Sequence, residues 1–288
     1  MEFLQPTSWR EALEMKTARA EALPIAGGTD VLVDLNFDRH RPEVILDLNR
    51  VAELSEWQPA NGRLRVGAGV SYSRIITELG QRLPGLAMAS RSVGSPQIRN
   101  RGTVGGNLGS ASPAGDAHPA LLAAGASIEV TSLRGSREIP VDEFFLGPKR
   151  NALKPDELIA GFWLRPAPGP QQFAKVGTRN AMVIAVCSFG LALDPEQQTV
   201  GTGIGSAGPT PLRAGEAERF LAEALGEGDH WRSGQPLPES ARERFGELVA
   251  RAARPIDDVR GTAAYRRRAL AVLARRTFAW AWQEYTAQ

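Results

Sequence analysis

Two glycine-rich segments carry the residue types best suited to binding a ligand through the backbone. The first is residues 24–31, Pro24-Ile25-Ala26-Gly27-Gly28-Thr29-Asp30-Val31. Its glycines let backbone N–H groups approach a ligand without a Cβ in the way. We expect a helix to start at its end, so the positive end of the helix dipole would favour a phosphate there. An ordinary strand–turn–helix junction would show the same pattern, and this segment alone leaves both interpretations open.

The second segment repeats this pattern about 75 residues later. It runs over residues 102–107 and contains Thr103-Val104-Gly105-Gly106-Asn107. Asp116 follows it and could accept hydrogen bonds from ribose hydroxyls. Two separate sets of backbone donors fit a diphosphate that bridges two bulky groups better than they fit a mononucleotide. The pair therefore favours a dinucleotide, without choosing between FAD and NAD.

The sequence gives little support for a classical dinucleotide fingerprint, a P-loop, a metal site or a catalytic residue. Gly67-Ala68-Gly69 is not followed by the third small residue that the dinucleotide fingerprint requires, and the Gly-Lys-Ser/Thr of a P-loop is missing. The three histidines, His40, His118 and His230, lack the spacing of metal ligands. The single cysteine, Cys187, lies in an apolar run and cannot ligate a cluster alone. We predict no metal and no acid–base or nucleophilic catalytic residue in this chain.

The composition is that of a globular protein. Of 288 residues, 42% are hydrophobic and 23% charged, and the net charge of +2 comes from interspersed basic and acidic residues. This distribution argues against a nucleic-acid partner. The longest mostly apolar run, residues 181–193, falls short of the roughly 20 residues of a membrane span. The N-terminus shows no secretion signal, so we expect a cytoplasmic location.

Local patterns predict a mixture of helices and strands that would position these segments. Ser8 and Glu11 form a capping-box pattern that opens a helix to about residue 18, and Ser71 is expected to cap a helix over residues 74–79. Residues 90–119 hold many glycines and prolines, which predicts an irregular functional loop. The further expected strands are 44–48, 64–67, 127–132, 182–193 and 199–204, and the further helices 31–37, 120–125, 212–225, 239–253 and 262–285.

The last expected helix has apolar positions on one face and arginines largely off that face. Packing of this face on a small sheet is the simpler interpretation, and binding of a partner is the alternative.

Several strings, taken in chain order, carry a resemblance to a known family. They are Ala26-Gly27-Gly28-Thr29-Asp30, residues 97–107, Ala111-Ser112-Pro113-Ala114-Gly115-Asp116, residues 175–179, Ile184-Ala185 and residues 258–267. The chain resembles the FAD-binding medium subunits of the xanthine dehydrogenase and aerobic carbon monoxide dehydrogenase family, the molybdenum hydroxylases. The resemblance extends over nearly the whole chain.

The resemblance implies FAD as the cofactor and assigns residues to it. Residues 24–31 would wrap the FAD diphosphate, and residues 103–107 would touch the diphosphate and the flavin edge. Asp116 would lie near the ribose and Lys175 close to the flavin ring. Ile159 would pack on the isoalloxazine and Val93 on the adenine, although Val93 replaces an aromatic residue found in some relatives.

The resemblance also implies a fold and a set of partners. We expect an α+β protein of the p-cresol methylhydroxylase type. Its FAD-binding domain would span residues 1–172, as two α/β subdomains of about 1–58 and 59–172. A C-terminal domain of a small antiparallel sheet with helices would span residues 173–288.

As the flavoprotein subunit of an oxidoreductase, the chain would belong to a heterotrimer, and two such heterotrimers would associate as a dimer. A large subunit would carry the molybdenum cofactor and a small subunit two [2Fe–2S] clusters, from which FAD would pass electrons to an external acceptor. Two other functions stay open: a stand-alone FAD-dependent oxidase or reductase, and a non-catalytic nucleotide- or nucleic-acid-binding module.

Overall fold

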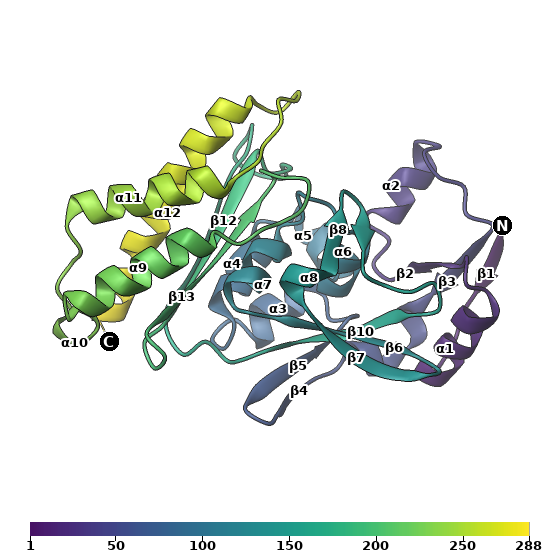
Figure 1. Cartoon of the computed structure of the whole chain (residues 1–288). Helices are drawn as coiled ribbons and strands as arrows, with labels where there is room; N and C mark the ends of the chain where they lie inside the picture. Colours follow the sequence, from purple (N-terminus) through teal and green to yellow (C-terminus); the bar gives the residue numbers. More distant parts are fainter. Residues whose placement is uncertain (288) are drawn as a thin grey trace.

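The computed structural model describes residues 1–287. Three blocks follow one another along the molecule (Figure 1): a small parallel sheet, a larger antiparallel sheet with short helices, and a three-stranded sheet covered by long helices. The α+β class expected from the sequence is confirmed.

The first block is a three-stranded parallel sheet with β3 in the centre, paired with β1 on one side and β2 on the other. Ser8 caps the first helix, since its Oγ accepts a hydrogen bond from the Glu11 amide, as the capping pattern predicts. Because parallel strands end at the same edge, the first glycine segment leaves β2 beside the end of β3. The elements are β1 Glu2–Leu4, α1 Trp9–Ala18, β2 Leu23–Ile25, α2 Val31–Asn36 and β3 Val44–Asp47.

The second block is a five-stranded antiparallel sheet of order β4-β5-β10-β6-β7. Six helices accompany it, and Ser71 caps α3 as predicted, with its Oγ accepting from the Arg74 amide. The strands are β4 Trp57–Ala60, β5 Arg63–Gly67, β6 Ser127–Ser132, β7 Gly135–Pro140 and β10 Leu158–Leu164, with a separate hairpin of β8 Phe145–Gly147 and β9 Arg150–Asn151. The helices are α3 Tyr72–Glu78, α4 Pro84–Arg91, α5 Pro96–Arg101, α6 Val104–Ser110, α7 Ala117–Ala123 and α8 Val141–Phe144.

The third block is an antiparallel sheet of order β11-β12-β13. Helices α9, α11 and α12 cover one face of this sheet, while α7 of the second block packs against β12 and β13 (Figure 1). The elements are β11 Gln171–Val176, β12 Cys187–Asp194, β13 Thr199–Gly205, α9 Gly215–Glu227, α10 His230–Ser233, α11 Glu239–Ala252 and α12 Ala263–Thr286. Helix α12 packs one face on α11 and on β12, which confirms the simpler of the two interpretations for that face.

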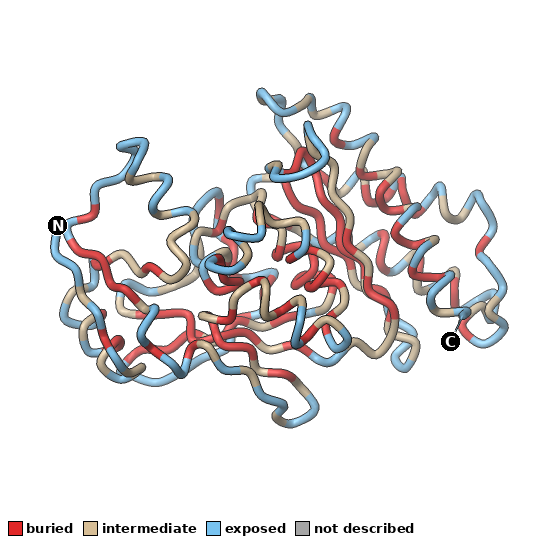
Figure 2. Tube along the Cα trace, turned by 180° about the vertical axis from the view of Figure 1, so that it is seen from behind, coloured by how far each residue is buried: buried red, intermediate tan, exposed pale blue. Residues whose placement is uncertain are grey.

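The described residues form two hydrophobic cores. One extends through the first two blocks, and the other lies between the β11–β13 sheet and its long helices. Figure 2 shows the buried strands of both regions, with the exposed residues on helix faces and in connecting loops. The second core is rich in rings, among them Phe189, Phe245, Phe278, Trp231 and Trp282.

The expectation of an irregular loop over residues 90–119 is wrong, since α5 and α6 lie within it. Each of these short helices has a side-chain cap: Ser95 accepts from the Ile98 amide and Thr103 from the Gly106 amide. Caps and close packing outweigh the low helix propensity of glycine here. A Cβ on Gly105 would lie 2.4 Å from the Ala68 carbonyl oxygen, so this helical glycine permits a close backbone approach.

The strand expected over residues 182–193 begins only at Cys187. Residues 177–186 leave the sheet as a loop, which Lys175 holds by donating to the Val183 carbonyl. Likewise, the helix expected from residue 212 begins at Gly215, because Leu212 instead exchanges two backbone hydrogen bonds with Ile204. At both places the apolar pattern predicts an earlier start of the strand or helix, and a tertiary contact holds the first residues in another conformation.

Candidate functional site

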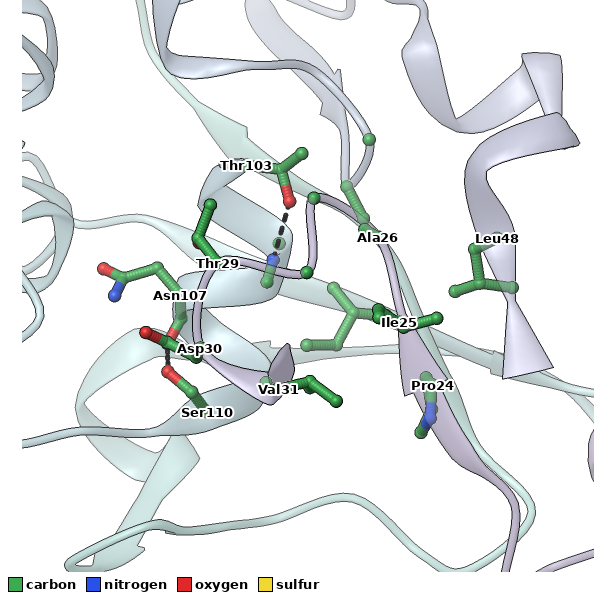
Figure 3. Close-up of a pocket in the computed structure, with 18 of the residues that line it drawn as sticks. Pro24, Ile25, Ala26, Thr29, Asp30, Val31, Leu48, Thr103, Asn107 and Ser110 are labelled. Carbon is green, nitrogen blue, oxygen red and sulfur yellow. Dashed lines mark hydrogen bonds between the residues drawn. The ribbon is translucent and has the colours of Figure 1, made fainter. Parts of the chain in front are cut away.

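A cavity of about 600 Å³ lies between the first and second blocks, where both glycine-rich segments meet (Figure 3). Its volume is in the usual range for ligand pockets, about 300–1,000 Å³. Most of the residues predicted from the sequence line it: Pro24, Ile25, Ala26, Gly27, Gly28, Thr29, Asp30, Val31, Val93, Thr103, Gly105, Gly106, Asn107 and Ile159.

The first glycine segment presents free backbone donors beside the cavity. The amides of Gly28, Thr29 and Asp30 donate to no other group within residues 1–287. Gly28 has a φ of 73°, a conformation that glycine adopts without strain. A Cβ on Gly27 would lie 1.9 Å from the Arg101 carbonyl oxygen, so glycine is required for this loop to approach the second segment.

The second glycine segment forms the first turn of α6. Thr103 Oγ1 accepts a hydrogen bond of 2.9 Å from the Gly106 amide, which fixes the start of the helix (Figure 3). The two glycines differ in their surroundings. Gly105 packs on Ala68, whereas a Cβ on Gly106 would meet only Thr103 Oγ1, at 3.2 Å. Because Gly106 lines the cavity, a larger side chain there would occupy ligand space rather than protein space.

Asn107 places an unused acceptor at the cavity wall. Its Oδ1 is buried and has no hydrogen-bond partner in residues 1–287. Its backbone carbonyl accepts from Ser110 Oγ at 3.0 Å (Figure 3) and lies 3.1 Å from His118 Nε2. A buried polar atom without a partner costs free energy.

His118 is a supporting residue that the sequence did not reveal. The ring is fully buried, and burial lowers its pKa from 6.5 to about 4, so it is neutral at pH 7. A neutral ring that donates from Nε2 to the Asn107 carbonyl holds α6 at its middle residue. Its place between Asp116 and Pro119 gave no signal of this contact.

Three of the predicted residues do not line the cavity. Val104 is buried in the core. Asp116 and Lys175 pair with each other at 2.6 Å, and both side chains are about 10% exposed. Lys175 Nζ also donates to the Ser92 carbonyl at 2.8 Å and to the Val183 carbonyl at 3.2 Å. Burial raises the pKa of Asp116, against the opposing effect of Lys175, and its Oδ1 has no partner in residues 1–287.

Other lining residues were missed because no motif marks them. Asn49 follows β3, and its Nδ2 donates to the Ala26 carbonyl at 2.8 Å, which orients the first glycine segment. Ala68 and Gly69 also line the cavity, although their segment does not form the dinucleotide fingerprint. The remaining lining residues are Leu23, Leu48, Leu54, Ser55, Ser71, Tyr72, Ile98, Asn100, Arg101, Gly109, Ser110, Asn151, Leu153 and Leu158.

Cys187 is buried, and burial raises the pKa of its thiol to about 12, as expected for a structural cysteine. Within residues 1–287 no three His, Cys, Asp or Glu side chains gather as a metal site would require. Among the same residues, none of the helices combines the length and apolar character needed to cross a membrane.

Comparison with family models matches two domains in chain order. Residues 1–164 match the FAD binding domain in molybdopterin dehydrogenase, and residues 172–281 match the CO dehydrogenase flavoprotein C-terminal domain. Together these matches cover most of the chain.

Individual relatives agree with the family models. The chain is 30% identical to the nicotine 6-hydroxylase medium subunit of Paenarthrobacter nicotinovorans, over 96% of this chain and 95% of the relative. It is 34% identical to a putative xanthine dehydrogenase FAD-binding subunit of Escherichia coli, over 74% and 76% of the two chains. Among solved structures, a carbon monoxide dehydrogenase from Hydrogenophaga pseudoflava superposes with a TM-score of 0.88 at 25% identity, covering 99% of this chain and 98% of the other.

Proposed function

Because this chain belongs to the family of FAD-binding medium subunits of molybdenum hydroxylases, we propose that its cavity holds FAD across the two glycine-rich segments. The chain is a flavoprotein subunit of an oxidoreductase that also has large and small subunits. In homologous complexes the molybdenum cofactor and the [2Fe–2S] clusters are on those other subunits. The stand-alone oxidase or reductase is not favoured, since the relatives are subunits of complexes.

One observation supports the binding mode most directly: both glycine segments border one cavity, and the first segment offers free backbone donors to it. The amides of Gly28, Thr29 and Asp30 lie on one side and the start of α6 on the other. Gly106 leaves open space in front of α6, since a Cβ there would meet only Thr103 Oγ1. Backbone donors beside open space are features that fit the diphosphate of FAD.

The residues of this chain then bind and orient FAD, and bound FAD supplies the redox chemistry. We propose direct contacts for the lining residues among 24–31 and 103–107, with Val93 and Ile159 packing on the ring systems. For Val104, Asp116 and Lys175, direct contact with FAD stays a prediction of the resemblance. Asp116 and Lys175 pair with each other and are not among the residues that line the cavity.

The finer organisation is also a proposal. We propose subdomains of about 1–58 and 59–172, a C-terminal domain of 173–288, and two heterotrimers per complex. Electrons would leave through FAD to an external acceptor, which could be a quinone, a cytochrome, oxygen or NAD. Native mass spectrometry of the complex tests the subunit count.

The variant Gly106→Val tests the binding mode. Its side chain would enter the cavity without meeting the protein backbone, so we expect a folded chain that no longer retains FAD. The measurement is visible flavin absorption per chain after purification with added FAD. Gly226→Ala is the matched control, since a Cβ there meets nothing within 4 Å. Normal flavin occupancy in Gly106→Val would refute the proposed position of the diphosphate.

A further inference from the structure

A single arginine supplies the positive charge at the wall of the cavity. Arg101 is the last residue of α5, and the lining residues within 1–287 include no other arginine and no lysine. Asp30 is the only acidic residue in the same set. Backbone amides offer an anion only partial charges, so a full positive charge beside them would add much to the binding of a diphosphate.

Arg101 lies where the two glycine segments touch. Its carbonyl oxygen would be 1.9 Å from a Cβ on Gly27, the residue directly before the free amides of residues 28–30. Its side chain donates from Nη2 to Asn49 Oδ1 at 3.3 Å, and Asn49 also lines the cavity. Both the main chain and the side chain of Arg101 therefore lie beside the first glycine segment.

Asn49 is held with its amide oxygen toward Arg101. Its Nδ2 donates to the Ala26 carbonyl at 2.8 Å and to Asp47 Oδ1 at 2.6 Å, two groups that can only accept. Burial opposes the ionisation of Asp47, but hydrogen bonds from Asn49 and Gln5 and the charge of Arg101 hold its pKa below the ordinary value. The ionised carboxylate fixes the amide, and the amide ties the guanidinium to the first glycine segment.

The charge of Arg101 is not neutralised by an ion pair within residues 1–287. Its side chain makes one hydrogen bond there, to the neutral amide of Asn49. By contrast, Arg63 and Arg65 of β5 pair with Glu138 and Glu129 at 2.8 and 2.6 Å. An unpaired guanidinium at a cavity wall can bind an anionic ligand, and its planar shape allows two parallel hydrogen bonds to a phosphate.

We propose that the guanidinium of Arg101 binds the diphosphate of FAD and that Asn49 positions it. This inference rests on the proposed function and adds a full charge to the backbone amides of the binding mode. It has two consequences. The affinity for FAD should fall as the salt concentration rises, because salt screens the attraction between exposed charges. ADP, which carries a diphosphate without a flavin, should depend on the same arginine.

Titration of FAD into the full-length chain freed of flavin, followed by calorimetry at two salt concentrations, tests this role. Arg101→Met keeps a long side chain and removes the charge, so we expect the Kd to rise roughly tenfold and to depend less on salt. Arg101→Lys should recover part of the loss, because lysine keeps the charge and lacks the planar fork. ADP should rank the three chains in the same order. The Tm should stay unchanged, since Arg101 is exposed and contacts Gly27 through its backbone.

Arg50→Met is the matched control. Arg50 follows Asn49 in the chain, is exposed, and is not among the residues that line the cavity. Its loss should change the Kd by no more than about twofold, because a distant exposed charge contributes little. An equal loss in Arg50→Met and Arg101→Met would overturn the direct contact, as would equal Kd values and equal salt dependence in Arg101→Met and the wild-type chain. A wild-type chain that binds no FAD would refute the proposed function together with this inference.

Discussion

The cavity region and the helix-covered face of the C-terminal sheet are packed in opposite ways. Around the cavity, glycines bring backbone against backbone, as Gly27 does with Arg101 and Gly105 with Ala68. In the C-terminal region, rings such as Phe245 and Phe278 pack edge to face at 6.1 Å between centroids. Small residues leave backbone amides and space for a ligand, whereas rings fill the volume between a sheet and its helices. The difference indicates that one region is built to bind and the other to support it.

The largest expected effect comes from breaking the backbone contact in the cavity region. Gly27→Val would place a branched side chain on the Arg101 carbonyl, where no flexible group can move away. We expect a loss of more than about 4 kcal/mol in the free energy of unfolding and no FAD retention. Urea denaturation and flavin absorption measure these. A stable, flavin-loaded variant would show that the two glycine segments do not approach as described.

The corresponding change in the C-terminal region should act on stability alone. Phe278→Ala removes a ring that is 1% exposed and should cost about 3–5 kcal/mol. The Kd for FAD should stay within about twofold, given that the ring lies in the other core. Urea unfolding and flavin titration of the same sample separate the two quantities. A parallel loss of FAD affinity would remove the functional distinction between the regions.

The contact between the regions gives a third test. Lys175→Met would leave Asp116 buried without its cation, at an expected cost of about 3 kcal/mol. The raised pKa of Asp116 limits this cost, because the carboxyl can bind a proton instead. The double variant Lys175→Met/Asp116→Leu should recover part of the loss. If the double variant were as unstable as the sum of both single changes, the pair would not be coupled.

The smallest effect concerns His118, which supports α6 behind the cavity. Because its pKa is about 4 in the folded chain and about 6.5 in the unfolded chain, the unfolded chain binds more protons between these values. This contribution to stability is complete above pH 6.5 and decreases as the pH falls toward 4. Between pH 7.5 and pH 5 we expect a loss of about 2 kcal/mol from this group. His118→Leu should lose this component of the pH dependence, measured by urea denaturation at each pH, and an unchanged slope would contradict the assignment.

Much of the local structure was predictable because its causes are local. Ser8 and Ser71 cap helices through residues three positions away, and the alternation of apolar residues marks strands such as β6. The glycine segments and the family resemblance also identified most of the cavity lining. By contrast, residues 90–119 were misjudged, because short capped helices packed on neighbouring backbone can tolerate glycine.

The sequence by itself determined the class of fold, the two binding segments and the family to which the chain belongs. Only the tertiary structure decided which atoms meet. Asp116 and Lys175 are 59 residues apart and pair with each other, and Asn49 orients a loop 23 residues before it. Nothing in the spacing of these residues encodes such contacts, since they depend on how strands and helices from separate blocks pack. The two glycine segments line one cavity for the same reason. Their backbones come into contact only because the first and second blocks pack against each other.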